Sequence, residues 1–145
     1  MSGDHILEDA IVLAAAAHRG QFDKAGMPYI LHPLRVMQRV EAYEERIAAV
    51  LHDTVEDGGV ELRLIRHRFG ERIADAVDAL SRRIGESYSE FIARCAGDPI
   101  ARVVKLADLY DNLDRTRIPF PSPADEARWE KYTRAKAVLL KDPGQ

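Results

Sequence analysis

The sequence predicts an all-α protein, a bundle of helices. Apolar residues recur three and four positions apart through most of the chain, which is the spacing of one helix face. Proline, glycine, serine and aspartate stand where these periodic segments begin and end. The alternating pattern of a half-buried β-strand is not evident in the sequence, nor is an internal repeat.

Length and composition predict one domain spanning residues 1–145. With 145 residues, 46% of them hydrophobic, the chain can bury roughly two-thirds of its unfolded surface in a single core. A net charge of -3 without a basic stripe argues against long nucleic acid as a partner. No apolar run has the length of a membrane span and the N-terminus does not resemble a signal peptide, so we expect a cytoplasmic protein. Cys95 stands alone, which excludes an intramolecular disulfide and favours a core position.

The first predicted helix runs from Asp4, its expected N-cap, to Arg19. A loop without periodicity covers residues 21–31 and leads to His32 and Pro33. Pro33 suits the first position of a second helix, and the residue before a proline is disfavoured in helical geometry. We therefore expect His32 to be held just outside that helix, at a fixed entrance that suits a ligand.

A third predicted helix runs through residues 47–59 and carries the most informative pattern. Its apolar run, residues 47–51, has no polar face, which implies burial on every side. His52, Asp53, Glu56 and Asp57 follow at once, and helical spacing would place His52 over Glu56 and Asp53 over Asp57. Two glycines then end the helix.

The second half of the chain is predicted to be helical as well. The expected helices cover residues 60–69, 71–82, 87–96, 98–114 and 122–140. Asp98 and Ser122 are N-cap candidates, each followed by a proline at the first helical position. Asp108 and Asn112, four residues apart on one of these helices, are expected to point the same way.

Buried carboxylates and imidazoles at the end of an apolar helix are unfavourable unless a cation neutralises them. Together with His32 and Asp108, the pair His52 and Asp53 would provide two imidazoles and two carboxylates for a metal ion. Such a mixed set suits manganese, iron or zinc. The alternative is a solvated, charged helix end.

Three motifs, AHRGQFDKAGMPYILHPLRV, AAVLHDTVED and VVKLADLYDNL, resemble in order and spacing those of the HD-domain alarmone hydrolases. This family comprises the hydrolase half of the Rel/SpoT proteins and the stand-alone small alarmone hydrolases. The resemblance covers about residues 14–140. It implies an HD-domain helical bundle around a single Mn²⁺ site and removal of pyrophosphate from the 3′ position of (p)ppGpp.

The resemblance also implies roles for individual residues, and each has a plainer alternative. The implied metal ligands are His32, His52, Asp53 and Asp108, the implied catalytic pair is Glu56 and Asp57, and the implied nucleotide contacts are Lys24, Tyr29 and Asn112. The alternatives are helix-end charges for the catalytic pair, a surface position for Lys24 and simple packing for Tyr29. His18 is expected near the site or as a satisfied helix-end histidine, and Lys105 either reaches the metal-site carboxylates or extends into solvent.

Two positions depart from the family pattern. Asp23 stands where the family has an arginine expected against the nucleotide base, and Leu109 follows Asp108 where an arginine is common. An anion beside an anionic substrate predicts weaker affinity for guanosine alarmones and an altered base preference. On this basis, replacing Asp23 with arginine should lower KM for ppGpp at low salt.

Three functions follow from these observations. The first is a Mn²⁺-dependent alarmone pyrophosphohydrolase acting on ppGpp or its adenosine counterpart. The second is an HD-type phosphohydrolase for another small nucleotide, for instance at the 2′-phosphate of NADPH. The third is a nucleotide-binding module without turnover, which would have no need of Glu56 and Asp57.

Overall fold

The computed structural model describes residues 5–141, and this part of the chain is helical, as expected. The elements are α1 (Ile6–Ala17), α2 (Leu31–Gln38), α3 (Tyr43–Leu51), α4 (Leu62–Phe69), α5 (Glu71–Ala79), α6 (Tyr88–Ala96), α7 (Pro99–Asn112), the 3₁₀ helix η2 (Arg115–Arg117) and α8 (Pro123–Leu140). Within residues 5–141, extended pairing is limited to one isolated bridge between Phe22 and Pro28. The predicted N-cap Asp4 lies outside the described residues.

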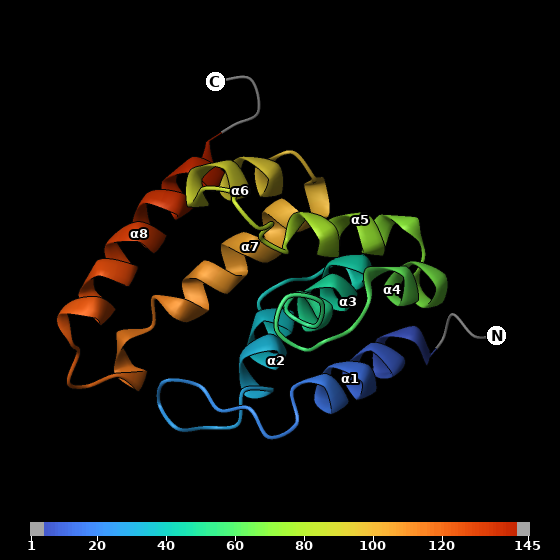
Figure 1. The fold of residues 1–145 in the computed structure, drawn as a ribbon, viewed down its shortest axis with the longest axis horizontal. Helices are drawn as coiled ribbons and strands as arrows, with labels where there is room; N and C mark the ends of the chain where they lie inside the picture. The colour runs from blue at the N-terminus through green and yellow to red at the C-terminus, as the bar shows by residue number, and fades with distance from the viewer. Residues whose placement is uncertain (1–4, 142–145) are drawn as a thin grey trace.

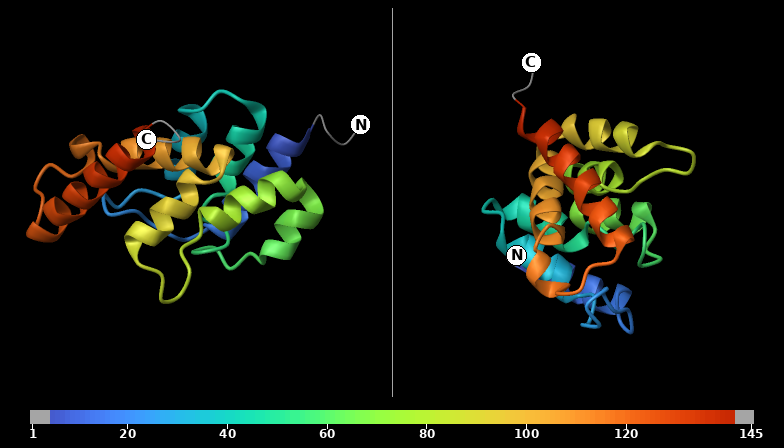
Figure 2. Two further views of the ribbon diagram at one scale, coloured as in Figure 1. Left: turned by 90° about the horizontal axis from the view of Figure 1, so that it is seen from above. Right: turned by 90° about the vertical axis from the view of Figure 1, so that its left-hand side faces the viewer.

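Helix α3 lies at the centre of the bundle (Figure 1), packed against α1, α2, α5 and α7. Its residues 47–51 are all buried, which confirms that this stretch of the helix is buried on every side. Helix α8 lies at the outside and packs on α6 and α7 (Figures 1 and 2). None of the helices within residues 5–141 is long and apolar enough to cross a membrane.

Local capping explains where three of the helices begin. Ser87 and Ser122 accept hydrogen bonds from the backbone N–H groups of Glu90 and Asp125, in capping boxes at the starts of α6 and α8. Asp98 accepts from two backbone N–H groups at the start of α7, and a proline follows it. Both expected caps, at residues 98 and 122, are confirmed.

Helix α2 begins earlier than predicted. It starts at Leu31, so His32 lies inside its first turn, and the prediction of a position outside the helix was wrong. Pro33 is then the third helical residue, where the backbone N–H has no partner within the helix in any case. The proline therefore costs no hydrogen bond, and His32 is still held rigidly beside it.

Helix α3 ends earlier than predicted. Regular helix stops at Leu51, and turns follow through residues 52–57, so the predicted extension of the helix to the two glycines was wrong. A helical hydrogen bond persists in the turn, from the Asp57 N–H to the Asp53 carbonyl at 2.9 Å. The Nδ1 of His52 hydrogen-bonds the carbonyl of Ala49 at 2.6 Å, and the hydroxyl of Thr54 donates to the carbonyl of Leu51 at 2.8 Å. These side chains occupy carbonyls of the last turn, and such competition commonly ends a helix.

Candidate active site

Four side chains from three helices meet beside the centre of the bundle: His32 from α2, His52 and Asp53 from the end of α3, and Asp108 from α7. All are buried. The Nε2 of His52 lies 3.1 Å from Asp53 Oδ2 and 3.4 Å from Asp108 Oδ1, and the Nε2 of His32 lies 2.8 Å from the same Asp108 oxygen. The structure thus brings together all four residues that the sequence predicted as metal ligands.

The arrangement fits a divalent cation. The Nε2 of His52 is buried and has no hydrogen-bond partner among the described residues, yet two carboxylate oxygens lie close to it. The opposite ring nitrogens are held in place, that of His52 by the Ala49 carbonyl and that of His32 by Asp111 at 2.7 Å. Fixing one nitrogen so that the other faces the centre is typical of metal-ligating histidines.

The carboxylates and imidazoles of this cluster shift one another's pKa. Burial lowers the pKa of His32 and His52, but the surrounding aspartates, which hydrogen-bond His32 and lie as negative charges close to His52, outweigh it, and the pKa of both rises above its ordinary value. Burial raises the pKa of Asp108, but Lys105 and the two histidines hold it well below its usual range. A divalent cation would replace protons in neutralising the carboxylates.

Asp111 is a buried part of the site that sequence reasoning missed. One of its carboxylate oxygens accepts from His32, and the other accepts from Arg35 Nε at 2.8 Å. Burial raises its pKa, but the bonds from His32 and Arg35 hold it below the ordinary value. An available signal was its position three residues after Asp108, on the same face of an otherwise apolar helix.

Three further side chains hold the cluster's carboxylates. Lys105 Nζ donates to Asp108 Oδ2 at 2.8 Å, which confirms that this lysine reaches the site. Asn112 Nδ2 donates to the other oxygen of Asp108 at 3.1 Å. The hydroxyl of Tyr29 donates to Asp53, and burial together with Asp53 raises its pKa, so it remains a proton donor.

Glu56 and Asp57 lie in the turn after α3, exposed at the mouth of the buried cluster. Carboxylate oxygens of Asp53, Glu56 and Asp57 approach within 4.8 Å of one another. Glu56 Oε1 accepts from the backbone N–H of Arg82 at 2.8 Å. Partial burial and the neighbouring carboxylates raise the pKa of both side chains. Two carboxylates at the edge of a cation site can position a water molecule and exchange protons with it.

The turn is fixed from the α1 side by a hydrogen-bonded chain. His18 is buried, and its Nδ1 lies 2.9 Å from Gln21 Oε1. Gln21 Nε2 in turn donates to the backbone carbonyl of Asp57 at 2.9 Å. Gly58 permits this close approach, because a Cβ there would lie 2.9 Å from the Ala17 Cβ and 2.8 Å from the Thr54 carbonyl oxygen. His18 therefore supports the turn near the site through Gln21, which was one of the two roles expected for it.

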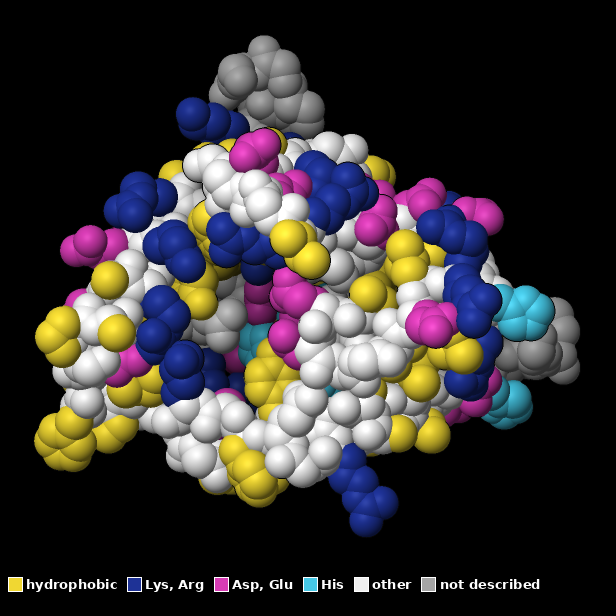
Figure 3. Space-filling view, viewed as in Figure 1, with side chains coloured by type: hydrophobic (Ala, Val, Ile, Leu, Met, Phe, Trp, Pro, Cys, Tyr) yellow, Lys and Arg dark blue, Asp and Glu magenta, His cyan; other side chains and the backbone are white. Residues whose placement is uncertain are grey.

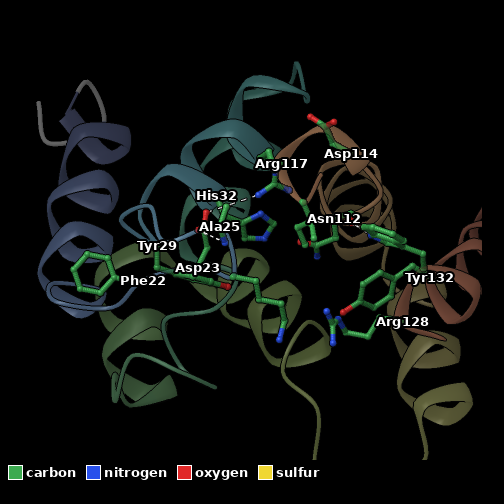
Figure 4. Close-up of a pocket in the computed structure, with 13 residues that line it drawn as sticks. Phe22, Asp23, Ala25, Tyr29, His32, Asn112, Asp114, Arg117, Arg128 and Tyr132 are labelled. Carbon is green, nitrogen blue, oxygen red and sulfur yellow. Dashed lines mark hydrogen bonds and ion pairs between the residues drawn. The ribbon is translucent and has the colours of Figure 1, made fainter. Parts of the chain in front are cut away.

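A pocket of about 350 Å³ opens beside the cluster. Its lining includes all three predicted nucleotide contacts, Lys24, Tyr29 and Asn112, together with His32. Arg117 of η2 and Arg128 of α8 also line the pocket (Figure 4). In Figure 3 the hollow has Lys and Arg side chains along one rim and acidic and histidine side chains within it. This distribution suits a ligand that is itself anionic.

A family model described as HD domain matches residues 10–94, more than half of the chain. The protein belongs to the HD-domain family. The match contains His32, His52 and Asp53, whereas Asp108 lies beyond it on α7.

This HD domain is similar to part of several larger proteins. It is 37% identical over 120 residues to a guanosine-3′,5′-bis(diphosphate) 3′-pyrophosphohydrolase of Aquifex aeolicus, covering 74% of this chain and 17% of that protein. It is 33% identical over 141 residues to a probable GTP pyrophosphokinase of Mycobacterium leprae, covering 88% of this chain and 18% of that protein. The chain thus spans under one-fifth of the length of these relatives.

The fold of the HD domain is also that of a solved structure, described as a metazoan orthologue of SpoT that hydrolyses ppGpp. The TM-score is 0.79 at 22% identity, with 94% of this chain and 85% of the other chain covered. This likeness extends the shared fold through α7 and most of α8, well beyond the matched family model. It supports the all-α HD bundle predicted from the sequence.

The two departures from the family pattern have different structural outcomes. Leu109 is fully buried in the core, so its side chain does not face the pocket. Asp23 lines the pocket, but its Oδ1 accepts from the backbone N–H groups of Ala25 and Met27, both at 2.9 Å. An arginine at position 23 would lose these bonds, so we now expect it to disturb the loop instead of simply improving affinity.

Proposed function

We propose that this HD domain hydrolyses the 3′-diphosphate of guanosine alarmones such as ppGpp and releases pyrophosphate. We further propose Mn²⁺ as its cofactor, bound by His32, His52, Asp53 and Asp108, and one functional domain over residues 1–145. The observation that carries the proposal is the buried cluster with an unpartnered His52 nitrogen, next to two exposed carboxylates and a polar pocket. The names of the relatives support the choice of substrate.

A divalent ion, when bound, would polarise a phosphoryl oxygen and favour deprotonation of a nearby water. Glu56 and Asp57 would orient the attacking water and accept its proton. The water oxygen would bond to the phosphorus attached to the 3′ oxygen, and the bond from that phosphorus to the 3′ oxygen would break. The proton returned by the carboxylates would then complete the 3′ hydroxyl as pyrophosphate leaves.

The pocket residues would hold the substrate in position for this reaction. Lys24 is exposed at the pocket and would contact phosphate groups. Asn112 and Tyr29 already bond the cluster carboxylates Asp108 and Asp53 and also line the pocket, so they would align the nucleotide with the reacting centre. Alignment of this kind raises rates without new chemistry.

A nucleotide panel tests the proposal. The protein is incubated with Mn²⁺ and ppGpp, the adenosine counterpart, or NADPH, and products are resolved by chromatography. We expect GDP and pyrophosphate from ppGpp. Orthophosphate release from NADPH alone would favour the phosphohydrolase alternative, and binding without any product would favour the module without turnover.

Glu56→Gln tests the role of the exposed carboxylates. Because general acid–base catalysis contributes about 10²- to 10⁴-fold, kcat should fall by that order while substrate affinity is largely kept. Glu61→Gln is the matched control. Glu61 is exposed, and its Oε2 lies 2.5 Å from Arg63 Nε, away from the site. A Glu56→Gln enzyme with the parent kcat would reduce Glu56 to a surface charge.

A further inference from the structure

The two carboxylate oxygens of Asp23 differ: one accepts hydrogen bonds from the loop backbone, and the other does not. Oδ1 accepts from two backbone N–H groups and closes the loop before α2. Oδ2 is buried and has no hydrogen-bond partner within the described part of the chain. It lies 3.8 Å from Nη1 of Arg117, which approaches from η2. A buried, unmatched acceptor thus lies at the wall of the nucleotide pocket.

Arg117 presents the complementary group. Its Nη2 donates to the backbone carbonyl of Asp111 at 2.5 Å and lies 3.4 Å from that residue's Oδ2. Its Nε is buried and lacks a hydrogen-bond partner among residues 5–141. Figure 4 shows Arg117 beside Asp23 and His32 at the pocket. The guanidinium that carries this unmatched donor thus lies 3.8 Å, through its Nη1, from the unmatched Asp23 acceptor.

Arg117 lies within ion-pair distance of two carboxylates, those of Asp23 and Asp111. A guanidinium in this state attracts a phosphate less than a free cation does. Its remaining donors suit a neutral ligand edge that offers acceptors, and the Asp23 oxygen suits a donor on the same edge. A nucleobase is the part of a nucleotide with these properties.

We propose that Asp23 and Arg117 together read the nucleobase of the substrate and favour guanine; this rests on the proposed function. Guanine presents two adjacent acceptors, N7 and O6, to which arginine commonly makes paired hydrogen bonds. Its N1–H donor lies next to O6 and would reach the Asp23 oxygen. Adenine has an amino donor in place of O6, and this donor would face the guanidinium. Arg117 thus supplies from η2 the cation that is missing at position 23.

Asp23→Asn and Arg117→Met test the pair. Asparagine keeps an oxygen for the two loop N–H groups and replaces the Oδ2 acceptor with an amino donor, so the loop stays closed while base reading changes. Methionine removes the guanidinium at similar length. Arg115→Met is the matched control, because Arg115 lies in η2 but stacks over Trp129 and does not line the pocket.

The measured quantity is the ratio of kcat/KM for ppGpp to that for its adenosine counterpart. We expect the parent protein to favour guanosine by about tenfold to 100-fold, the usual size of one paired base contact. Each pocket variant should lose most of that ratio through KM, and Arg115→Met should keep it. A parent protein without preference for guanosine, or an unchanged ratio in both pocket variants, would overturn the proposal.

Calorimetric titration with GDP and ADP separates this proposal from the proposed function, because it needs no turnover. A GDP preference that both pocket variants lose would support base reading even if no alarmone were hydrolysed. Melting temperature and metal content are measured alongside, since Arg117 also contacts Asp111. Asp23→Asn does not touch Asp111, so it still decides the matter if Arg117→Met loses metal or unfolds.

Discussion

The buried His/Asp cluster and the wall of the pocket formed by the loop before α2, η2 and α8 are built in different ways. The four clustered side chains come from α2, α3 and α7, which pack on one another, and all four are buried. The wall comes from the loop before α2, from η2 and from α8, and most of its side chains are partly exposed. The core therefore holds the cluster residues in place. At the wall, by contrast, the same charged group can be supplied by different segments of the chain.

Asp23 and Arg117 illustrate this difference. The family's expected arginine is absent from position 23, yet a guanidinium reaches the same place from η2. His52 cannot be replaced in this way by a residue from another segment. Its Nδ1 is bonded to the Ala49 carbonyl of its own helix, and this bond fixes the direction of Nε2. Substitutions in the buried cluster should therefore be tolerated less well than substitutions in the pocket wall.

The largest expected effect is loss of the cluster itself. Asp108→Ala and His52→Ala should each lose bound divalent metal and, with it, hydrolysis, because each removes a ligand and leaves other buried charges unmatched. Elemental analysis of purified protein checks this. His67→Ala, at an exposed histidine of α4, is the control and should keep the parent metal content. Undiminished metal in both cluster variants would contradict the ligand assignment.

A smaller effect is expected from the residue that orients His32. Asp111→Asn keeps the size of the side chain but weakens its bond to the imidazole, so metal affinity should fall about 10- to 100-fold. Competition with a chromophoric chelator measures this. Asp114→Asn is the control, because Asp114 caps η2 through Thr116 and lies in the pocket wall. Equal metal affinity in the two variants would show that Asp111 does not support the cluster.

The smallest effect concerns the hydrogen bond between the loop after α1 and the turn after α3. Gln21→Ala removes two side-chain hydrogen bonds, one to the Asp57 carbonyl and one with His18, and a bond of this kind contributes about 0.5–1.5 kcal/mol. We expect kcat to fall about two- to tenfold at unchanged metal content. Gln38→Ala, at the exposed end of α2, is the control. A loss of metal in Gln21→Ala would contradict this prediction and show that Gln21 supports the buried cluster.

The sequence predicted the parts of the molecule that depend on local patterns. The caps at Asp98 and Ser122 and the burial of residues 47–51 follow from helix periodicity and short motifs. The grouping of His32, His52, Asp53 and Asp108 was implied by the family resemblance. The end of α3 was misplaced because side-chain bonds to the last carbonyls outweigh the apolar pattern there.

Contacts between distant segments were beyond the reach of sequence patterns. Asp111 bonds His32 across 79 residues, and its spacing from Asp108 indicates a shared helix face but does not say which distant residue it contacts. The pairing of Asp23 with Arg117 joins a loop to a 3₁₀ helix that has no hydrophobic period to reveal it. Position 23 was recognised as unusual, but its partner could be found only in three dimensions.

The meeting of His32 and Asp108 has a thermodynamic consequence. These residues are 76 positions apart, so an ion held by both would close a long loop of the chain, much as a cross-link does. Because the ligands are assembled only in the folded state, metal at 100 times its Kd would add about 2.7 kcal/mol to the free energy of unfolding. Chelation should then lower the melting temperature as well as the activity. In a cell short of the metal, the lifetime of the protein would follow the metal supply.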